Sequence, residues 1–256
     1  MNKKLLIIAF SVLLFFAFIA LILIPIGKKP PHKPIPAVKG RIAVVIDDWG
    51  YNLANLKIAE EIKYPLTCAV LPNLKNSGLV ARRLNSLGFE IILHLPMQPK
   101  EKYRLEKETI TASMDRAQIR AIINKDLASV LFARGISNHM GSYITEDTRV
   151  SSLIISEVKK RNLYFLDSFV TAKSVCSVLA KRMRVRFAKR GIFLDNRDDP
   201  EYIKGQIIKL KELSARKGYA VGIGHDRRNT LLVLKKMIPE LEKSGYKFIF
   251  VSEIAK

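Results

Sequence analysis

Short apolar runs alternate with longer amphipathic segments along the chain beyond residue 40. Seven runs are typical of buried strands: Ile42–Ile46, Leu66–Leu71, Glu90–Leu93, Tyr164–Leu166, Ile192–Leu194, Ala220–Ile223 and Lys247–Val251. Between them, helical spacing of apolar residues occurs in Leu53–Ile62, Ser77–Leu87, Asp115–Phe132, Val150–Arg161, Ser174–Met183, Pro200–Lys217 and Thr230–Ser244. Such alternation predicts an α/β fold with a parallel sheet and helices on its faces. The sheet could be open and doubly wound or closed into a barrel.

Helix boundaries support this interpretation. Pro200 suits the first turn of a helix, and Gly88, Gly218 and Gly245 stand where helices are expected to end.

The N-terminal segment has a different pattern. Residues Leu5–Ile26 carry no charge, and about 33 Å of helix would cross a hydrocarbon core of about 30 Å. We expect a transmembrane signal anchor over residues 1–27, a Pro/Lys-rich linker over 28–39 and a folded domain over 40–256. The alternative is a signal peptide cleaved near Gly27. Lysines flank the run on both sides, which weakens the positive-inside signal for orientation. We expect the N-terminus inside and the domain on the extracytoplasmic, periplasmic side, which makes the uncleaved chain a single-pass protein of the cytoplasmic membrane.

Composition narrows the class of protein. The 256 residues include 48% hydrophobic residues, which excludes disorder along the whole chain, and only two cysteines, Cys68 and Cys176, which excludes a disulfide-dense miniprotein. The net charge is +21, and a dense basic stretch comprises Lys181, Arg182, Arg184, Arg186, Lys189 and Arg190. This stretch is either a solvated face or a surface for anionic lipid or an acidic envelope polymer. No nucleic-acid-binding module is recognisable, so nucleic acid is not an expected partner.

Acidic residues, histidines and two smaller polar residues gather where the predicted strands end. They are Asp47, Asp48, His94, Asp167, Ser168, Asp195 and His225, together with Asn138 and His139 in the connection after the Asp115 helix. In parallel α/β folds the carboxyl ends of the strands form the active site. The alternative for Asp167 and Asp195 is a purely structural role, in which each only caps the next helix.

These residue types favour metal-assisted hydrolysis. Two histidines, His94 and His139, with one or two carboxylates form a set suited to zinc or a similar divalent metal. One of Asp47 and Asp48 could bind the metal while the other acts as a general base, and His225 is the natural general acid. The chain has no G-x-S-x-G elbow, no P-loop and no H-E-x-x-H motif.

Several strings resemble the divergent polysaccharide deacetylase family, a distant branch of the NodB-type carbohydrate esterases. They are VVIDDWG (44–50), AVLP (69–72), EIILHLPMQP (90–99), GISNHMGS (135–142), Leu166-Asp167-Ser168, IFLDN (192–196) and VGIGH (221–225). The resemblance implies a distorted (β/α) barrel of about seven parallel strands. It also implies metal-dependent removal of acetyl groups from an acetylated polysaccharide or other glycan.

The resemblance also implies roles for individual residues. It points to Asp47 as the base, Asp48 and His94 as metal ligands, and His225 as the acid. The family's second histidine falls at Gln98 here, so His139 is the candidate replacement. Asn138, Gln98, Asp167, Ser168 and Asp195 are candidate supporting residues. The arginine-proline element of ordinary NodB enzymes has no clear match, and the insertion Pro99–Met114 reads as a lid or rim of the pocket.

Three functions therefore compete. The first is a membrane-anchored deacetylase of a cell-envelope polysaccharide. The second is an inactive or altered envelope protein that keeps the fold and binds glycan, which Gln98 and the missing arginine element favour. The third is a basic module for polyanions, whose affinity would fall steeply with salt.

Overall fold

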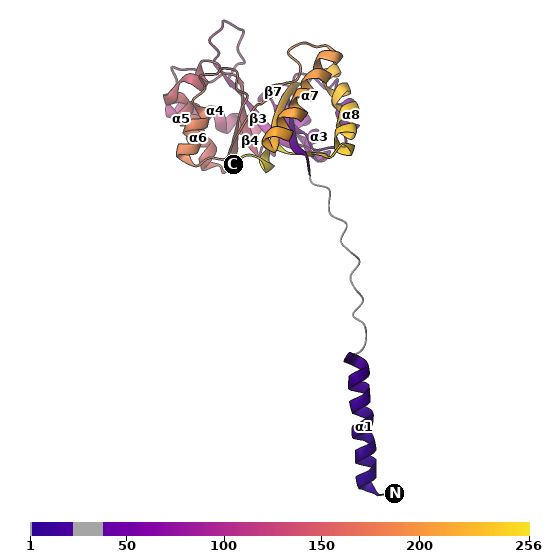
Figure 1. Cartoon of the computed structure of the whole chain (residues 1–256). Helices are drawn as coiled ribbons and strands as arrows, with labels where there is room; N and C mark the ends of the chain where they lie inside the picture. The colour runs from indigo at the N-terminus through magenta and orange to yellow at the C-terminus, as the bar shows by residue number, and fades with distance from the viewer. Residues whose placement is uncertain (1, 23–37) are drawn as a thin grey trace. The chain divides into compact units, whose positions relative to one another are not determined.

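The computed structural model describes residues 2–22 and 38–256. The chain divides into two units, residues 1–36 and 37–256 (Figure 1). Helix α1 (Lys3–Ile22) belongs to the first unit. Among the described residues, no helix is both long and apolar enough to cross a membrane. The rest of the predicted anchor and all but the last two residues of the predicted linker lie outside the described residues.

The second unit is built on one parallel sheet. Its strands are β1 (Gly40–Trp49), β2 (Thr67–Val70), β3 (Glu90–Met97), β4 (Gly135–Met140), β5 (Tyr164–Asp167), β6 (Phe187–Lys189), β7 (Ile192–Phe193), β8 (Tyr219–His225) and β9 (Tyr246–Ile249). Their order is β6-β5-β4-β3-β2-β1-β8-β7, and β9 pairs with the start of β1. The end strands β6 and β7 do not pair with each other within the part of the chain that is described. The sheet is therefore an open half-barrel rather than a closed barrel.

The predicted count of about seven strands is too low. Within residues 38–256 the sheet has nine strands, and the sequence pattern missed β4 and β6. In β4, Ser137, Asn138 and His139 are consecutive polar residues, yet all three are buried. Strand β6 has only three residues and lies in the basic stretch. Neither segment presents the apolar run by which a buried strand is recognised.

All seven predicted helices are present, with bounds that differ by a few residues in most. They are α2 (Leu56–Glu60), α3 (Ser77–Ser86), α4 (Arg116–Ser129), α5 (Thr148–Lys160), α6 (Cys176–Met183), α7 (Pro200–Lys217) and α8 (Arg228–Lys243), with 3₁₀ turns η1 (Ile144–Glu146) and η2 (Val251–Glu253). The side chain of Asp199 caps α7 by accepting from the Tyr202 amide, and Pro200 occupies the first turn as expected. Gly218 ends α7 in the left-handed conformation.

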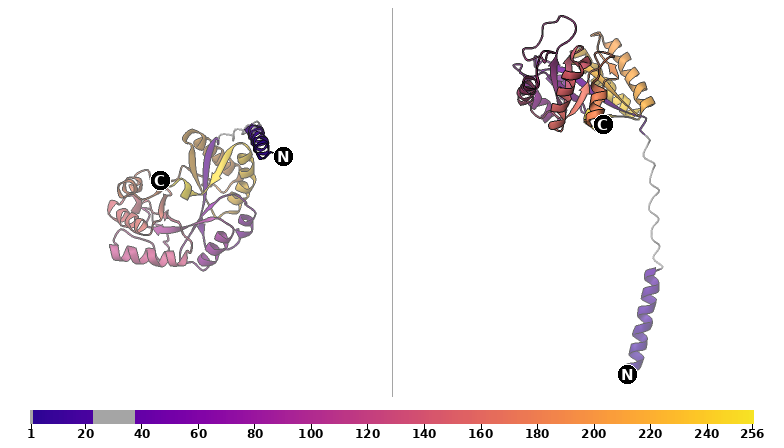
Figure 2. Two further views of the ribbon diagram at one scale, coloured as in Figure 1. Left: turned by 90° about the horizontal axis from the view of Figure 1, so that it is seen from below. Right: turned by 90° about the vertical axis from the view of Figure 1, so that its left-hand side faces the viewer.

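The helices form an outer ring around the strands (Figure 2, left). Both faces of the sheet are consequently buried, which explains why the strands read as continuous apolar runs. On β1, Ile42, Val44 and Ile46 belong to the larger core, whereas Ala43 and Val45 belong to the smaller cluster that also contains Val251 and Ile254 of the C-terminal segment. Cys68 and Cys176 are both buried and free.

The smaller cluster encloses a buried carboxylate. Glu90 Oε1 accepts hydrogen bonds from Thr67 Oγ1 (2.9 Å) and from the Tyr164 hydroxyl (2.8 Å). The Tyr164 ring packs so close to Gly135 that a Cβ there would lie 2.6 Å from the ring. Glu90 is the first residue of β3, so this carboxylate lies at the amino ends of the strands. The candidate site lies at their carboxyl ends.

Candidate metal-dependent active site

The site begins at the Asp47-Asp48 pair, where β1 becomes irregular. The pairing register between β1 and β2 shifts between Ile46 and Trp49. Asp48 lies within this irregularity with a φ of 65°, a left-handed conformation that short polar side chains such as aspartate tolerate better than most. Adjacent carboxylates can then serve different functions, because the bulge redirects one of them.

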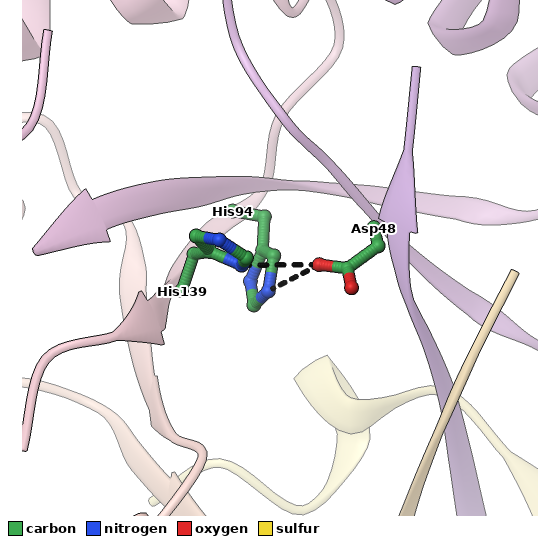
Figure 3. A group of neighbouring side chains, drawn as sticks. All are labelled: Asp48, His94 and His139. Atoms are coloured by element: carbon green, nitrogen blue, oxygen red, sulfur yellow. Dashed lines mark ion pairs between the residues drawn. The ribbon is translucent and has the colours of Figure 1, made fainter. Parts of the chain in front are cut away.

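Asp48 of β1 lies next to two histidines, His94 of β3 and His139 of β4 (Figure 3). Its Oδ1 atom lies 3.4 Å from His94 Nε2 and 3.0 Å from His139 Nδ1. Strands β3 and β4 are direct neighbours in the sheet, which places the two imidazole rings 5.0 Å apart in an edge-to-face arrangement. One ligand atom from each of the three residues lies within 4.8 Å of the others.

This arrangement fits a divalent metal. Asp48 Oδ1 is buried and has no hydrogen-bond partner despite its proximity to both imidazoles, which is unusual for a carboxylate oxygen. Burial raises the pKa of Asp48, but His139 and His94 outweigh that effect and hold the pKa well below its ordinary value. An ionised carboxylate oxygen and two imidazole nitrogens are ligands typical of zinc, and three protein ligands leave room for substrate.

Both histidines are also held from the far side of the ring. Ser137 Oγ lies 2.8 Å from His94 Nδ1, which leaves Nε2 directed at Asp48. Glu106 Oε2 lies 3.5 Å from His139 Nε2, and the Tyr51 hydroxyl donates to Glu106 Oε1 at 2.6 Å. Burial lowers the pKa of His139, but Asp48 and Glu106 outweigh it and raise the pKa to about 9.

Sequence reasoning missed Tyr51 and Glu106 as members of the site. Tyr51 directly follows the VVIDDWG string, so its position in the chain was a usable signal. Glu106 lies within the insertion expected to form a lid or rim, among several charged residues that the sequence does not distinguish. Only the folded structure of the insertion shows that Glu106 lies beside His139.

Asp47 approaches the same nitrogen of His94 as Asp48 does. It is 2% exposed, and its Oδ2 lies 3.5 Å from His94 Nε2 while its Oδ1 has no hydrogen-bond partner. Burial raises the pKa of Asp47, and the nearby His94 opposes the rise only in part. A buried carboxylate of raised pKa with a free oxygen is suited to accept a proton.

His225 lies at the end of β8, in register with Asp47 on β1. Asp195 is fully buried and its Oδ1 lies 2.7 Å from His225 Nδ1, while its Oδ2 accepts from the His225 amide and from Thr230 Oγ1. The Phe193 ring stacks on the imidazole at 6.0 Å. Burial lowers the pKa of His225, but Asp195 outweighs it and raises the pKa above its ordinary value.

The alternative interpretation of Asp195, as a helix cap only, is wrong. Helix α7 is capped by Asp199, and no side chain caps α6, so Asp167 is not a cap either. Asp167 instead accepts from the Phe169 amide and the Ser174 hydroxyl. Asp195 alone of the two contacts a candidate catalytic residue.

The other candidate supporting residues stabilise the walls of the site without entering the cluster. Asn138 Oδ1 accepts from the Ser168 amide, and the Ser168 hydroxyl donates to the Asn138 carbonyl. Gln98 Oε1 accepts from the Ala112 amide at the base of the loop between β3 and α4. Gln98 therefore does not replace a histidine in the cluster, and His139 takes that position.

The basic stretch separates into two groups. Arg190 donates to the Ser168 and Phe169 carbonyls and lies over the Phe193 ring, and Arg186 donates to the Asn162 carbonyl. Lys181 and Arg184 are exposed and line a surface cavity with the C-terminal residue Lys256. Part of the stretch thus supports the fold, and part faces solvent.

A parallel half-barrel with an Asp-His-His cluster at the carboxyl ends of its strands defines a class of carbohydrate-esterase-like proteins. Residues 44–255 match the family model described as divergent polysaccharide deacetylase. The chain belongs to this family, as the resemblance had indicated.

Two proteins of known sequence are similar to the chain. YibQ of Escherichia coli (strain K12) is 33% identical over 206 residues, which cover 80% of this chain and 65% of that protein. A protein of Haemophilus influenzae (strain ATCC 51907 / DSM 11121 / KW20 / Rd) is 31% identical over 197 residues, which cover 77% of this chain and 70% of that protein. The chain therefore matches about two thirds of the length of these relatives.

Solved structures share the fold. ATU2773 from Agrobacterium tumefaciens C58 superposes with a TM-score of 0.80 at 19% identity, over 86% of this chain and 91% of that one. A family 4 acetyl xylan esterase from Clostridium thermocellum in complex with a cobalt ion gives 0.52 at 15% identity, over 84% and 89%. A CE4 family pseudoenzyme from Bacillus anthracis, BA3943, gives 0.54 at 16% identity, over 87% and 67%. The fold thus occurs both in a cobalt-bound esterase and in a pseudoenzyme.

Proposed function

We propose that this protein is a metal-dependent hydrolase that removes acetyl groups from a cell-envelope polysaccharide. The observation that carries the proposal is the convergence of Asp48, His94 and His139 on one point, with Asp47 beside His94. Membership of the deacetylase family supports an acetylated glycan as the substrate. Zinc is the expected metal, because one carboxylate oxygen and two imidazole nitrogens match its preferences.

The proposed reaction assigns the metal ligands to Asp48, His94 and His139. When bound there, a divalent metal supplies Lewis acidity toward the acetyl carbonyl oxygen. Asp47 accepts a proton through its free Oδ1 as a water oxygen bonds to the acetyl carbon. Burial favours this step, because the raised pKa of Asp47 makes its carboxylate a stronger base than an exposed aspartate.

His225 completes the proposed reaction. Its imidazolium donates a proton to the sugar nitrogen or oxygen as the bond between that atom and the acetyl carbon breaks. The products are acetate and the free amine or hydroxyl of the glycan. Asp195 on Nδ1 directs the other ring nitrogen, Nε2, toward the substrate, and it raises the pKa of His225, which favours the protonated ring.

The competing function is glycan binding without turnover. The Bacillus anthracis pseudoenzyme shows that a CE4 fold can occur in a protein described as inactive. Against it here, the buried Oδ1 of Asp47 lacks a hydrogen-bond partner. Keeping such a group without a chemical role costs stability, roughly 1–3 kcal/mol.

The deciding experiment combines metal content with turnover. The untagged protein, its His94→Ala and His139→Ala variants and a control at the exposed Asp198, Asp198→Asn, are analysed for bound metal and for acetate release from acetylated chitooligosaccharides and peptidoglycan. We expect near-stoichiometric metal and acetate release in the wild type, loss of both in the histidine variants, and retention in the control. Metal without acetate release would favour the glycan-binding function. Absence of metal after dialysis against zinc would refute the mechanism.

We also propose an extracytoplasmic location, with membrane anchoring through the uncharged run Leu5–Ile26. This proposal rests on the sequence alone. Cell fractionation with protease access to spheroplasts tests it, since a cytoplasmic domain would be protected. At that location, the exposed Lys181 and Arg184 would meet anionic lipid or acidic envelope polymers.

A further inference from the structure

The two histidines of the cluster are held in the same way. Each directs one ring nitrogen at Asp48, and each has the other nitrogen beside a polar side chain. For His94 that side chain is Ser137 on β4, part of the rigid sheet. For His139 it is Glu106, which belongs to the loop between β3 and α4.

This loop is attached at its base and exposed at its tip. Gln98 and the backbone of Pro96 bond to Ala112 and Ile110 at the base, and the loop stands out from the domain in Figure 1. Residues 101–105 are exposed to solvent. Beyond the tip, Glu106 turns back toward the site, with its side chain 17% exposed. Tyr51, from the end of β1, fixes its carboxylate through a 2.6 Å hydrogen bond.

We propose that the loop 98–115 is a lid coupled to the metal, with Glu106 as the positioning residue that orients His139. This inference rests on the proposed function, because it assigns Glu106 a role toward the metal at Asp48, His94 and His139. Glu106 Oε2 lies 3.5 Å from His139 Nε2, a buried nitrogen with no hydrogen-bond partner in the described part of the chain. A small approach lets Glu106 accept from the Nε2–H, which presents the Nδ1 lone pair to the metal. Tyr51 holds Glu106 in the conformation in which it reaches the ring.

The physical basis is that a ligand's orientation is part of its affinity. Carboxylates that bond to the outer nitrogen of a metal-binding histidine fix its tautomer and ring position, and their loss typically lowers metal affinity 10–100-fold. Coupling of this kind is reciprocal. If the closed lid strengthens metal binding, bound metal must stabilise the closed lid by the same factor. Metal release and lid opening are then two aspects of one equilibrium.

The first test measures zinc affinity by chelator competition, using the untagged full-length protein. We expect Glu106→Gln to weaken zinc binding about 10–100-fold. Tyr51→Phe is expected to weaken it about threefold, since removal of one hydrogen bond only loosens Glu106. The matched control is Glu108→Gln, which alters the same loop at a residue paired with Lys125 rather than with His139. Its affinity should stay within twofold of the wild type.

The second test uses trypsin, because the exposed tip contains Lys102 and Arg104. Saturating zinc should slow cleavage at the tip about tenfold or more in the wild type and in Glu108→Gln. Zinc should have little effect on tip cleavage in Glu106→Gln, because closure of the lid is no longer coupled to metal binding. The Glu106→Gln protein thereby also shows that zinc does not inhibit the protease.

The outcomes separate the inference from the proposed function. If the wild type binds no zinc, the proposed function is refuted. If it binds zinc but Glu106→Gln binds it within twofold as tightly, or zinc leaves tip cleavage unchanged, the coupled lid is refuted and the proposed function stands. Should Glu106→Gln misfold, as judged by its metal-free melting temperature, the Tyr51→Phe affinity and protection decide in its place.

Discussion

Asp126 offers a test of the electrostatics of this fold that needs neither metal nor substrate. It lies on α4 with no exposed surface. Asn73 donates to its Oδ1 at 2.6 Å, and its Oδ2 has no partner. Burial raises the pKa of Asp126 to about 7 from an ordinary value of 3.8, with the Asn73 hydrogen bond opposing and Glu108 adding to the rise.

A raised carboxyl pKa makes the folded state bind the proton more tightly than the unfolded state. Stability from this group is therefore present below pH 4 and is lost as the pH rises through about 7. The full difference corresponds to about 4 kcal/mol at 1.36 kcal/mol per pKa unit. Relaxation and water access reduce this, and we expect about 2 kcal/mol.

The substitution Asp126→Asn replaces the titrating group with a neutral one that can still accept from Asn73. Compared with the wild type, its free energy of unfolding should be similar or lower at pH 4.5 and about 2 kcal/mol higher at pH 8. Urea denaturation followed by circular dichroism at several pH values measures the difference. The control is Asp198→Asn, because Asp198 is exposed.

The reasoning is refuted if the difference between Asp126→Asn and the wild type is constant within 0.5 kcal/mol from pH 4.5 to pH 8. It is also refuted if Asp198→Asn reproduces the trend, since a general charge effect would then explain both.

Three further predictions concern separate parts of the domain. Asp195→Asn should lower kcat for acetate release about 100-fold and move the alkaline limb of the pH profile of kcat to lower pH, since His225 loses the carboxylate that raises its pKa. An unchanged His225 titration by NMR would contradict this. Gly135→Ala should cost about 2–3 kcal/mol in urea denaturation, because its Cβ would meet the Tyr164 ring at 2.6 Å, whereas Gly205→Ala, with open space around it, should not destabilise. Lys181→Glu with Arg184→Glu should remove the preference of the protein for vesicles containing anionic lipid over neutral vesicles while leaving acetate release intact, and a wild-type preference that does not weaken with salt would count against an electrostatic surface.

Most of the strands that were predicted correctly are buried on both faces of the sheet, although β7 and β9 are only partly buried. A segment such as Ile42–Ile46 must be apolar throughout, so its sequence reports its environment directly. Helix α7 was predicted to the residue because Asp199, Pro200 and Gly218 supply local start and stop signals. Strand β4 was missed because its buried side chains Ser137, Asn138 and His139 serve the site rather than the core.

The residues of the candidate site could be nominated from sequence for a related reason. In a parallel sheet every carboxyl end reaches the same edge, so Asp48, His94 and His225 could be grouped without coordinates. The open half-barrel could not be predicted, since it depends on whether β6 and β7, the end strands of the sheet, pair with each other.

What the sequence by itself determined is the alternation of helices with seven of the strands and the chemical groups at the strand ends, because both follow from local pattern and from the shared direction of parallel strands. Only the tertiary structure decided which groups touch. It bound Gln98 to the loop base, placed Asp195 on His225, and brought Glu106 and Tyr51 to His139. Such pairings join residues far apart in the chain, and their contact depends on how loops and strands pack rather than on any local pattern.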